Sequence, residues 1–123
     1  MTRVLNSVPQ RTDRTLAVCH ENDVLPNTGV AALVEGQAIA IFRLDDEQWF
    51  AIGNVDPFSQ ASVLSRGIVG DIDGVPVVAS PIYKQHFRLQ DGVCVEDDSV
   101  SVPSFGVFVD DAGTVTLSLT DPS

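Results

Sequence analysis

The sequence is short of positive charge, cysteine and long apolar runs, and each shortage excludes a class of protein. Seven Lys and Arg residues stand against seventeen Asp and Glu, for a net charge of −10. Binding to nucleic acid or to an anionic membrane surface needs clustered basic residues, so we expect neither. No apolar run approaches the roughly 18 residues of a membrane-spanning helix, and the N-terminus has no signal-peptide pattern. We therefore expect a cytoplasmic protein.

Only two cysteines are present, Cys19 and Cys94, and they lie far apart without a Cys-x-x-Cys spacing. This pattern predicts neither a zinc site nor a redox-active dithiol. Because free cysteine packs like a small apolar residue, we interpret both as reduced thiols of the core. A disulfide between them is the alternative.

What the sequence does contain is a succession of short β-rich runs separated by turn residues about every ten positions. A hairpin is predicted around Glu35-Gly36, with further turns at residues 71–74, 90–92 and 110–113. No segment has apolar residues at helical spacing over three turns. The chain of 123 residues has the usual size of one domain. We predict an all-β domain, an antiparallel β-sandwich or barrel.

The predicted domain covers residues 15–120 and begins with a strand at Thr15. Residues 1–14 are polar and show no periodicity, so we expect a flexible N-terminal tail. Gly29 is interpreted as a breaker in the loop that follows the first strand. The mostly polar segment 53–66 is expected to be a loop with one short turn of helix at most.

Two segments have the outline of an iron–sulfur site: residues 53–67, GNVDPFSQASVLSRG, and residues 79–87, ASPIYKQHF. Their arrangement resembles the Rieske pattern, in which Cys-x-His in one loop and Cys-x-x-His in a second loop hold a [2Fe–2S] cluster. The resemblance implies a Rieske-like fold in which these segments form the two former cluster-binding loops.

All four ligand positions of that pattern carry other residues, Asn54 and Asp56 in the first loop and Ser80 and Tyr83 in the second. Their oxygen donors suit Mg²⁺ or Ca²⁺ far better than an iron–sulfur cluster. We therefore expect neither a cluster nor another metal in this chain. The four side chains are interpreted as hydrogen-bonding groups that hold the loops together where a cluster once did.

Within the Rieske-like proteins the sequence is most similar to the small subunits of assimilatory NAD(P)H-dependent nitrite reductases. This similarity implies an accessory subunit of a cytoplasmic complex that reduces nitrite to ammonium in nitrate assimilation. The implied partner is a large subunit that carries siroheme, FAD and an iron–sulfur cluster, and no catalytic residue is expected in this chain. The similarity rests on the runs AIFR (40–43), AIGNVDPF (51–58), VLSRGIVGD (63–71), ASPIYKQHF (79–87) and DGVC (91–94).

The few basic residues beyond Arg43 are grouped. Arg66, Lys84 and Arg88 are the only Lys or Arg there, against thirteen Asp and Glu, and all three lie on or directly after the two loops. Together with His86 they are predicted to form a small positive patch that docks on the large subunit. Two alternatives are a nitrite-attracting role for Lys84 and His86, and a purely structural, hydrogen-bonded His86.

Two other functions stay open. A Rieske-type electron-transfer protein would need the cluster whose ligands the pattern lacks. A stand-alone enzyme or regulatory binding domain is the other, since fold does not determine function. Asp56, Ser80 and His86 can be drawn as a hydrolase triad, but their order and spacing match no hydrolase motif.

Overall fold

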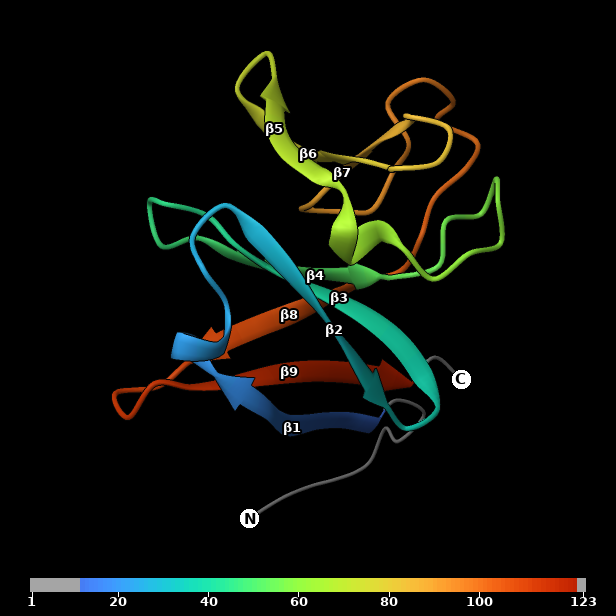
Figure 1. Cartoon of the computed structure of the whole chain (residues 1–123). Coiled ribbons are helices and arrows are strands. Elements are labelled where there is room, and N and C mark those ends of the chain that lie inside the picture. Colours follow the sequence, from blue (N-terminus) through green and yellow to red (C-terminus); the bar gives the residue numbers. More distant parts are fainter. Residues whose placement is uncertain (1–11, 122–123) are drawn as a thin grey trace.

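The structure, a computed structural model, describes residues 12–121, and these form short strands joined by turns (Figure 1). The described part of the chain contains no α-helix, and none of its elements has the length and hydrophobicity of a membrane-crossing helix. The predicted all-β class is confirmed. The strands are β1 (Thr12–His20), β2 (Thr28–Val34), β3 (Gln37–Arg43), β4 (Trp49–Gly53), β5 (Ile68–Ile72), β6 (Val75–Ala79), β7 (His86–Arg88), β8 (Ser104–Val109) and β9 (Thr114–Asp121), with two 3-10 turns, η2 (Glu21–Asp23) and η3 (Leu64–Arg66).

The strands form two antiparallel sheets. Six strands form a curled sheet in the order β1-β9-β8-β4-β3-β2, and three form a smaller sheet in the order β5-β6-β7. Figure 1 shows the smaller sheet over one end of the curled sheet, and the connection between β4 and β5 links the two sheets. This arrangement places the two loops of interest, residues 54–63 and 80–85, at the junction of the sheets.

The predicted hairpin turns are confirmed. Glu35 and Gly36 join β2 to β3 with φ of 51° and 81°, and Asp73 and Gly74 join β5 to β6 with φ of 52° and 84°. Two successive residues of positive φ are the mark of a type I′ turn, whose twist matches that of the flanking strands. The register of both hairpins follows from these two-residue turns.

Strand β3 is the wall shared by two hydrophobic cores. Ile39 and Ile41 face the core enclosed by the curled sheet, while Ala40 and Phe42 face the core between the curled sheet and the smaller one. Successive side chains of a strand point to opposite faces, so a strand covered on both sides must be apolar nearly throughout. The run QAIAIFR satisfies this requirement, and its four central residues are all buried.

Two predicted boundaries differ from the structure. Strand β1 begins at Thr12, three residues before the expected Thr15, and Thr12 to Arg14 pair with β9. These polar residues belong to an edge strand. Backbone hydrogen bonds to one neighbouring strand hold such a strand in place, whichever side chains it carries. The predicted tail therefore does not extend to residue 14, and residues 1–11 lie outside the described part. Strand β9 also extends to Asp121, one residue past the expected end.

Gly29 is not a loop breaker but a member of β2. A Cβ atom built on it would lie 2.6 Å from the ring of Phe42 and 3.0 Å from the carbonyl oxygen of Ser65. The glycine is needed because an aromatic ring and the backbone of η3 both pack onto this point of the strand.

Both cysteines are free thiols, and no disulfide joins them. Cys94 is buried as expected, whereas Cys19 on β1 is half-buried. Burial raises the pKa of each thiol, and the carboxylate of Asp23 adds to the effect at Cys19. A raised pKa leaves less of the reactive thiolate at neutral pH, so both groups are poor nucleophiles.

Candidate functional site: the two loops

A buried hydrogen bond joins the first loop, residues 54–63 between β4 and η3, to the second loop, residues 80–85 between β6 and β7. The hydroxyl of Ser80 donates to Oδ2 of Asp56 at 2.5 Å. Both residues are almost completely buried, at 0% exposure for Asp56 and 1% for Ser80. They occupy a former histidine position and a former cysteine position of the Rieske pattern, so side chains bond directly where a cluster would have joined the loops.

Each partner of this bond also shapes its own loop. Oδ1 of Asp56 accepts a hydrogen bond from the backbone N–H of Phe58 at 2.8 Å. The hydroxyl oxygen of Ser80 accepts one from the backbone N–H of Ile82 at 3.3 Å. Asp and Ser side chains commonly close tight turns by bonding the backbone two residues onward. One pair of side chains thus fixes both turns and their relative position.

Asn54 ties the start of the first loop to the 3-10 turn that ends it. Its Oδ1 accepts a hydrogen bond from the backbone N–H of Ser65 at 2.6 Å, and its Nδ2 donates to the hydroxyl of Ser62 at 2.8 Å. The side chain is 2% exposed. Because buried amide groups are costly without partners, this fully bonded Asn holds the loop closed.

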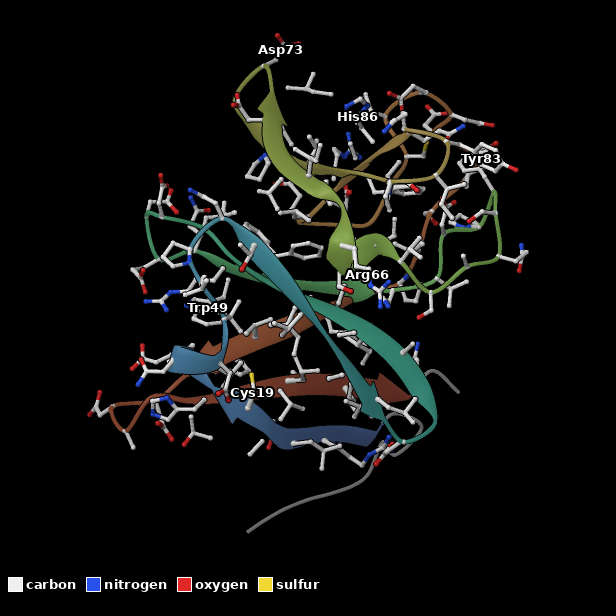
Figure 2. The ribbon with its side chains drawn as sticks, in the orientation of Figure 1. Cys19, Trp49, Arg66, Asp73, Tyr83 and His86 are labelled. Carbon is white, nitrogen blue, oxygen red and sulfur yellow. The ribbon has the colours of Figure 1, made fainter. Side chains whose placement is uncertain are left out.

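Tyr83 differs from the other three former ligand positions. Its side chain is 58% exposed, and its hydroxyl forms no hydrogen bond with any residue of the described range. Figure 2 shows it in the second loop. The expectation that all four side chains hold the loops together is therefore wrong for Tyr83. The structure brings Asp56 and Ser80 into contact, places Asn54 beside them in the first loop, and turns Tyr83 outward.

This arrangement does not fit a [2Fe–2S] cluster. A Rieske cluster needs two thiolates and two imidazoles, whereas the three buried positions offer amide, carboxylate and hydroxyl groups already bonded to protein atoms. Neither free thiol lies in the loops. Within residues 12–121, no group of three or more His, Cys, Asp or Glu is placed to hold a metal ion.

Two of the predicted docking residues are paired with acids of the same chain. Nδ1 of His86 lies 2.6 Å from a carboxylate oxygen of Glu96, and Arg88 binds Asp91 through two contacts of 2.7 and 3.0 Å. The hydrogen bond from Arg88 lowers the pKa of Asp91. Partial burial opposes ionisation of Glu96, but hydrogen bonds from His86 outweigh it and lower its pKa as well.

The other two docking residues have no acidic partner in the described part of the chain. Arg66 ends η3 and Lys84 follows Tyr83 in the second loop, and both are exposed. Figure 2 shows Arg66 beside η3, well apart from the labelled Tyr83 and His86. Of the four predicted docking residues, His86 and Arg88 are thus paired with acids of the described chain, whereas Arg66 and Lys84 are not.

The predicted sites missed a set of exposed apolar side chains on the two loops. The sequence did distinguish this surface, because Asp56 is the only acidic residue in the segments 53–67 and 79–86 of a strongly acidic chain. Asp56 is buried, so these two segments expose no carboxylate. We call this set the loop tip. Its members are Val55, Phe58, Ile82 and Tyr83, with exposed fractions of 40%, 36%, 43% and 58%.

Residues 12–121 form no hydrolase triad. The hydroxyl of Ser80 donates to Asp56, whereas the imidazole of His86 bonds Glu96, so no histidine lies in position to accept the serine proton. Glu96 also works against a nitrite site at His86, because its carboxylate repels an anion.

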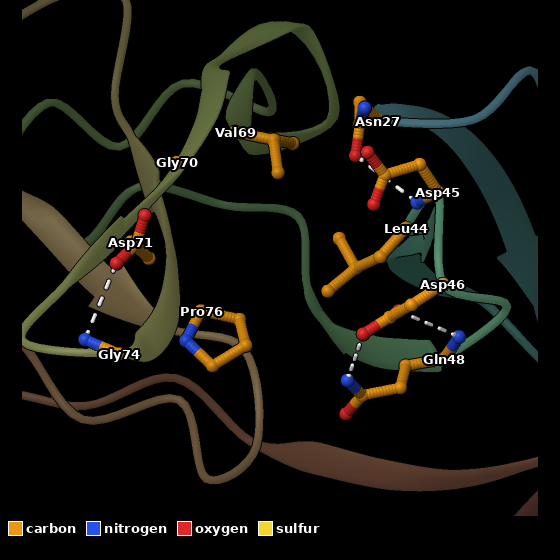
Figure 3. A pocket seen from close by; sticks show the side chains of 10 residues that line it. All are labelled: Asn27, Leu44, Asp45, Asp46, Gln48, Val69, Gly70, Asp71, Gly74 and Pro76. Carbon is orange, nitrogen blue, oxygen red and sulfur yellow. Dashed lines mark hydrogen bonds between the residues drawn. The ribbon is translucent and has the colours of Figure 1, made fainter.

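A cleft of about 410 Å³ lies away from both loops, between the β3–β4 connection and the β5–β6 hairpin (Figure 3). Three carboxylates line it, and two of them close turns. Asp46 accepts hydrogen bonds from the backbone and side chain of Gln48, and Asp71 accepts one from the backbone of Gly74. Turn formation thus explains two of the three acids of this cleft.

Comparisons with known proteins point to one family. The family model described as a Rieske-like [2Fe-2S] domain matches residues 15–118. The chain is 50% identical over 101 residues to the nitrite reductase (NADH) small subunit of Salmonella typhimurium, covering 81% of this chain and 93% of that protein. A crystal structure from Mycobacterium tuberculosis, described as an NADH-dependent nitrite reductase small subunit, superposes with a TM-score of 0.84 at 44% identity and covers 88% of this chain and 96% of that one.

Two further similarities concern the fold and a large subunit. The ferredoxin of carbazole 1,9a-dioxygenase from Nocardioides aromaticivorans shares the fold, with a TM-score of 0.71 at 20% identity over 89% of this chain and 98% of its own. A stretch of the nitrite reductase [NAD(P)H] large subunit of Klebsiella oxytoca is 45% identical over 76 residues, which are 62% of this chain and 8% of that protein. A stretch similar to this chain thus also occurs within a large subunit.

Proposed function

The chain belongs to the Rieske-like [2Fe-2S] domain family and, within it, to the nitrite reductase (NADH) small subunits, and on this premise we propose that it is an accessory subunit without a cluster of its own. The complex reduces nitrite to ammonium with electrons from NADH or NADPH, in the cytoplasm, as a step of nitrate assimilation. The small subunit contributes no reacting group and acts by binding its partner.

One observation carries the cluster-free part of this proposal, the buried hydrogen bond between Ser80 and Asp56. It occupies two of the four former ligand positions with groups that satisfy one another. A thiolate or imidazole ligand is not available at either position, and the loops are already joined without one. Electron transfer through this chain therefore lacks a carrier, which disfavours the Rieske-type redox alternative.

We propose that the partner is the large subunit and that it holds the siroheme, FAD and iron–sulfur cluster of the complex. The Klebsiella oxytoca protein supports this partner, because its large subunit contains a stretch similar to this chain in a single polypeptide. The predicted docking residues remain part of the proposal. Arg66 and Lys84 are the two whose charge is not already paired with an acid of the described chain, so they are best able to meet acidic groups of a partner.

Co-purification and metal analysis test the proposal together. A tagged small subunit is isolated from its own cells grown on nitrite, and the material is assayed for a large siroheme-containing protein and for NADH-dependent nitrite reduction before and after the small subunit is stripped away. We expect the large protein to co-purify and the activity to fall on stripping. The isolated small subunit, treated with iron and sulfide, should stay colourless. A chain that emerges alone, or one that takes up a stoichiometric cluster, contradicts the proposal.

A further inference from the structure

The loop tip is the part of this surface that the proposed function leaves unexplained. Val55 and Phe58 come from the first loop, and Ile82 and Tyr83 from the second, so two loops carry four exposed apolar side chains. The loops are in contact, since Ser80 bonds Asp56 beneath them. Exposed apolar side chains that are grouped on neighbouring loops mark a site of interaction more often than scattered ones do.

These side chains stand on a rigid base. The ring of Phe58 packs against the buried ring of Phe87, with centroids 6.2 Å apart. The second loop is closed by a hydrogen bond from the backbone N–H of Lys84 to the carbonyl of Ser80 at 3.1 Å. A surface already held in one conformation loses little entropy when a partner binds, so its apolar area contributes more fully to affinity.

The charge around the loop tip is unlike that of the rest of the molecule. The chain carries a net charge of −10, yet the two loops expose no carboxylate, because Asp56 is buried. Glu96 reaches the end of the second loop, where His86 binds it. Lys84 lies beside Tyr83 and pairs with no acid of the described residues. A neutral-to-positive apolar surface on an acidic protein is complementary to an apolar patch bordered by acidic groups.

Resting on the proposed function, we propose that the loop tip is the surface that binds the large subunit, with Lys84 at its rim. Interfaces of this kind are centred on a few buried aromatic and aliphatic anchors, and Tyr83 and Ile82 have the chemistry and the exposure for that role. The large subunit is the occupant because a similar stretch is covalently part of it in Klebsiella oxytoca. Binding rests mainly on apolar contacts, and the charge of Lys84 sets orientation and rate.

The test compares loop-tip variants with matched variants of the curled sheet. Ile82→Asp and Tyr83→Ala change the loop tip, and Leu33→Asp and Phe108→Ala make the same changes to exposed apolar residues of β2 and β8. Phe108 is 58% exposed, as Tyr83 is, and Leu33 is 76% exposed. The Kd of each purified small subunit for the large-subunit holoenzyme is measured by biolayer interferometry, with circular dichroism and thermal melting to show that each variant is folded.

We expect both loop-tip variants to weaken binding at least about tenfold, as anchor residues do, and both control variants to stay within about threefold of the wild type. Lys84→Glu should slow association, and its effect should shrink as salt concentration rises. Since the exchanged side chains are exposed, none of these variants removes a core contact.

The outcomes separate this inference from the function on which it rests. Wild-type chain that does not bind the large subunit contradicts the proposed function itself. Wild-type binding together with unchanged affinity of Ile82→Asp and Tyr83→Ala overturns only the loop-tip inference. Sedimentation of the small subunit alone is a further measurement, because it shows whether copies of this chain associate. If the loop-tip variants dissociate a dimer of this chain while binding the large subunit normally, the loop tip is a contact between copies and the inference is wrong.

Discussion

At the scale of single residues, three of the four former ligand positions carry buried side chains whose polar groups are hydrogen-bonded within the protein. Asp56 and Ser80 form a hydrogen bond inside the protein, and Asn54 uses both ends of its amide nearby. Polar groups of this kind are costly to bury without a partner. Hydrogen bonds among a few buried polar groups therefore hold the loops in place.

A matched pair of serine variants measures what burial adds to this bond. Ser80 donates to Asp56 in the interior, whereas Ser99 donates to Asp97 at 2.6 Å in an exposed turn. Ser80→Ala should lower the free energy of unfolding by about 1–3 kcal/mol, because the Asp56 carboxylate loses its buried donor. Ser99→Ala should change it by no more than about 0.5 kcal/mol, as surface substitutions do. Urea denaturation of both variants checks this, and equal losses would contradict it.

The sequence was sufficient to find these positions but not their bonds. Asn54, Asp56 and Ser80 stand out because the surrounding motif is specific about where ligands belong. That Ser80 bonds Asp56, 24 residues away, depends on how two loops approach each other, which no local pattern encodes. Tyr83 shows the limit most clearly, since its hydroxyl suggested a buried donor and the loop turns it toward water.

At the scale of elements, the loops are attached to the sheets by close backbone packing. Gly67 follows η3 and lies against the end of β6, where a Cβ atom would come within 2.2 Å of the carbonyl oxygen of Ala79. Ala79 directly precedes Ser80, so this contact also positions the second loop. A backbone carbonyl within a strand cannot move aside as a flexible side chain can.

A glycine pair tests this attachment. Gly67→Ala should lower the free energy of unfolding by at least about 1–3 kcal/mol, since the added methyl group overlaps backbone that must shift to admit it. Gly70→Ala is the control, because nothing lies within 4 Å of the position of its Cβ atom and its φ is not in the positive range. That variant should be neutral or slightly stabilising. Similar stability of both variants in thermal melting would show that the contact at Gly67 is loose.

The Arg88–Asp91 pair, which stabilises the turn after β7, predicts a pH dependence. The hydrogen bond from Arg88 keeps the pKa of Asp91 in the folded protein below its ordinary value of 3.8. The carboxylate therefore stabilises the fold at neutral pH, and this contribution is lost as the pH falls below about 4 and through the lowered pKa. Stability measured from pH 6 to pH 3 should fall less steeply for Asp91→Asn than for the wild type.

The size of this effect should be below about 1 kcal/mol, because both side chains are partly exposed to solvent. Asp111→Asn is the control. Asp111 is an exposed residue of the β8–β9 turn and forms no ion pair within residues 12–121. Its removal should leave the slope of stability against pH unchanged. If the slope of stability against pH were the same in Asp91→Asn as in the wild type, Arg88 would not act on this carboxyl group.

Most elements could be predicted from the sequence because their ends carry explicit turn chemistry. Glu35-Gly36 and Asp73-Gly74 are two-residue turns with positive φ at both residues. Turns of this kind join two antiparallel strands, so each of them predicts a strand on either side. The start of β1 and the place of Gly29 could not be predicted, because each is decided by a partner distant in the chain, β9 in one case and the ring of Phe42 in the other.

At the scale of the whole molecule, an acidic β domain presents one surface that differs from the rest. Its net charge of −10 keeps copies of the chain apart and opposes contact with nucleic acid. The loop tip lacks that protection, since it exposes apolar side chains and no carboxylate. The fold thus supplies both a repulsive surface and a region suited to a lasting contact. The measurements of affinity for the large subunit described above decide whether that region is where the contact is made.

The buried bond between Ser80 and Asp56 also bears on how this subunit is made. A domain whose loops are joined by a metal cluster reaches its final form only after iron and sulfide have been delivered, because metal binding and folding are coupled. Here the hydrogen bond that joins the loops is formed by the polypeptide itself, and it is present as soon as the chain has folded. Under the proposed function, the small subunit is therefore ready for assembly in an iron-starved cell, and the maturation of the large subunit sets the supply of finished complex.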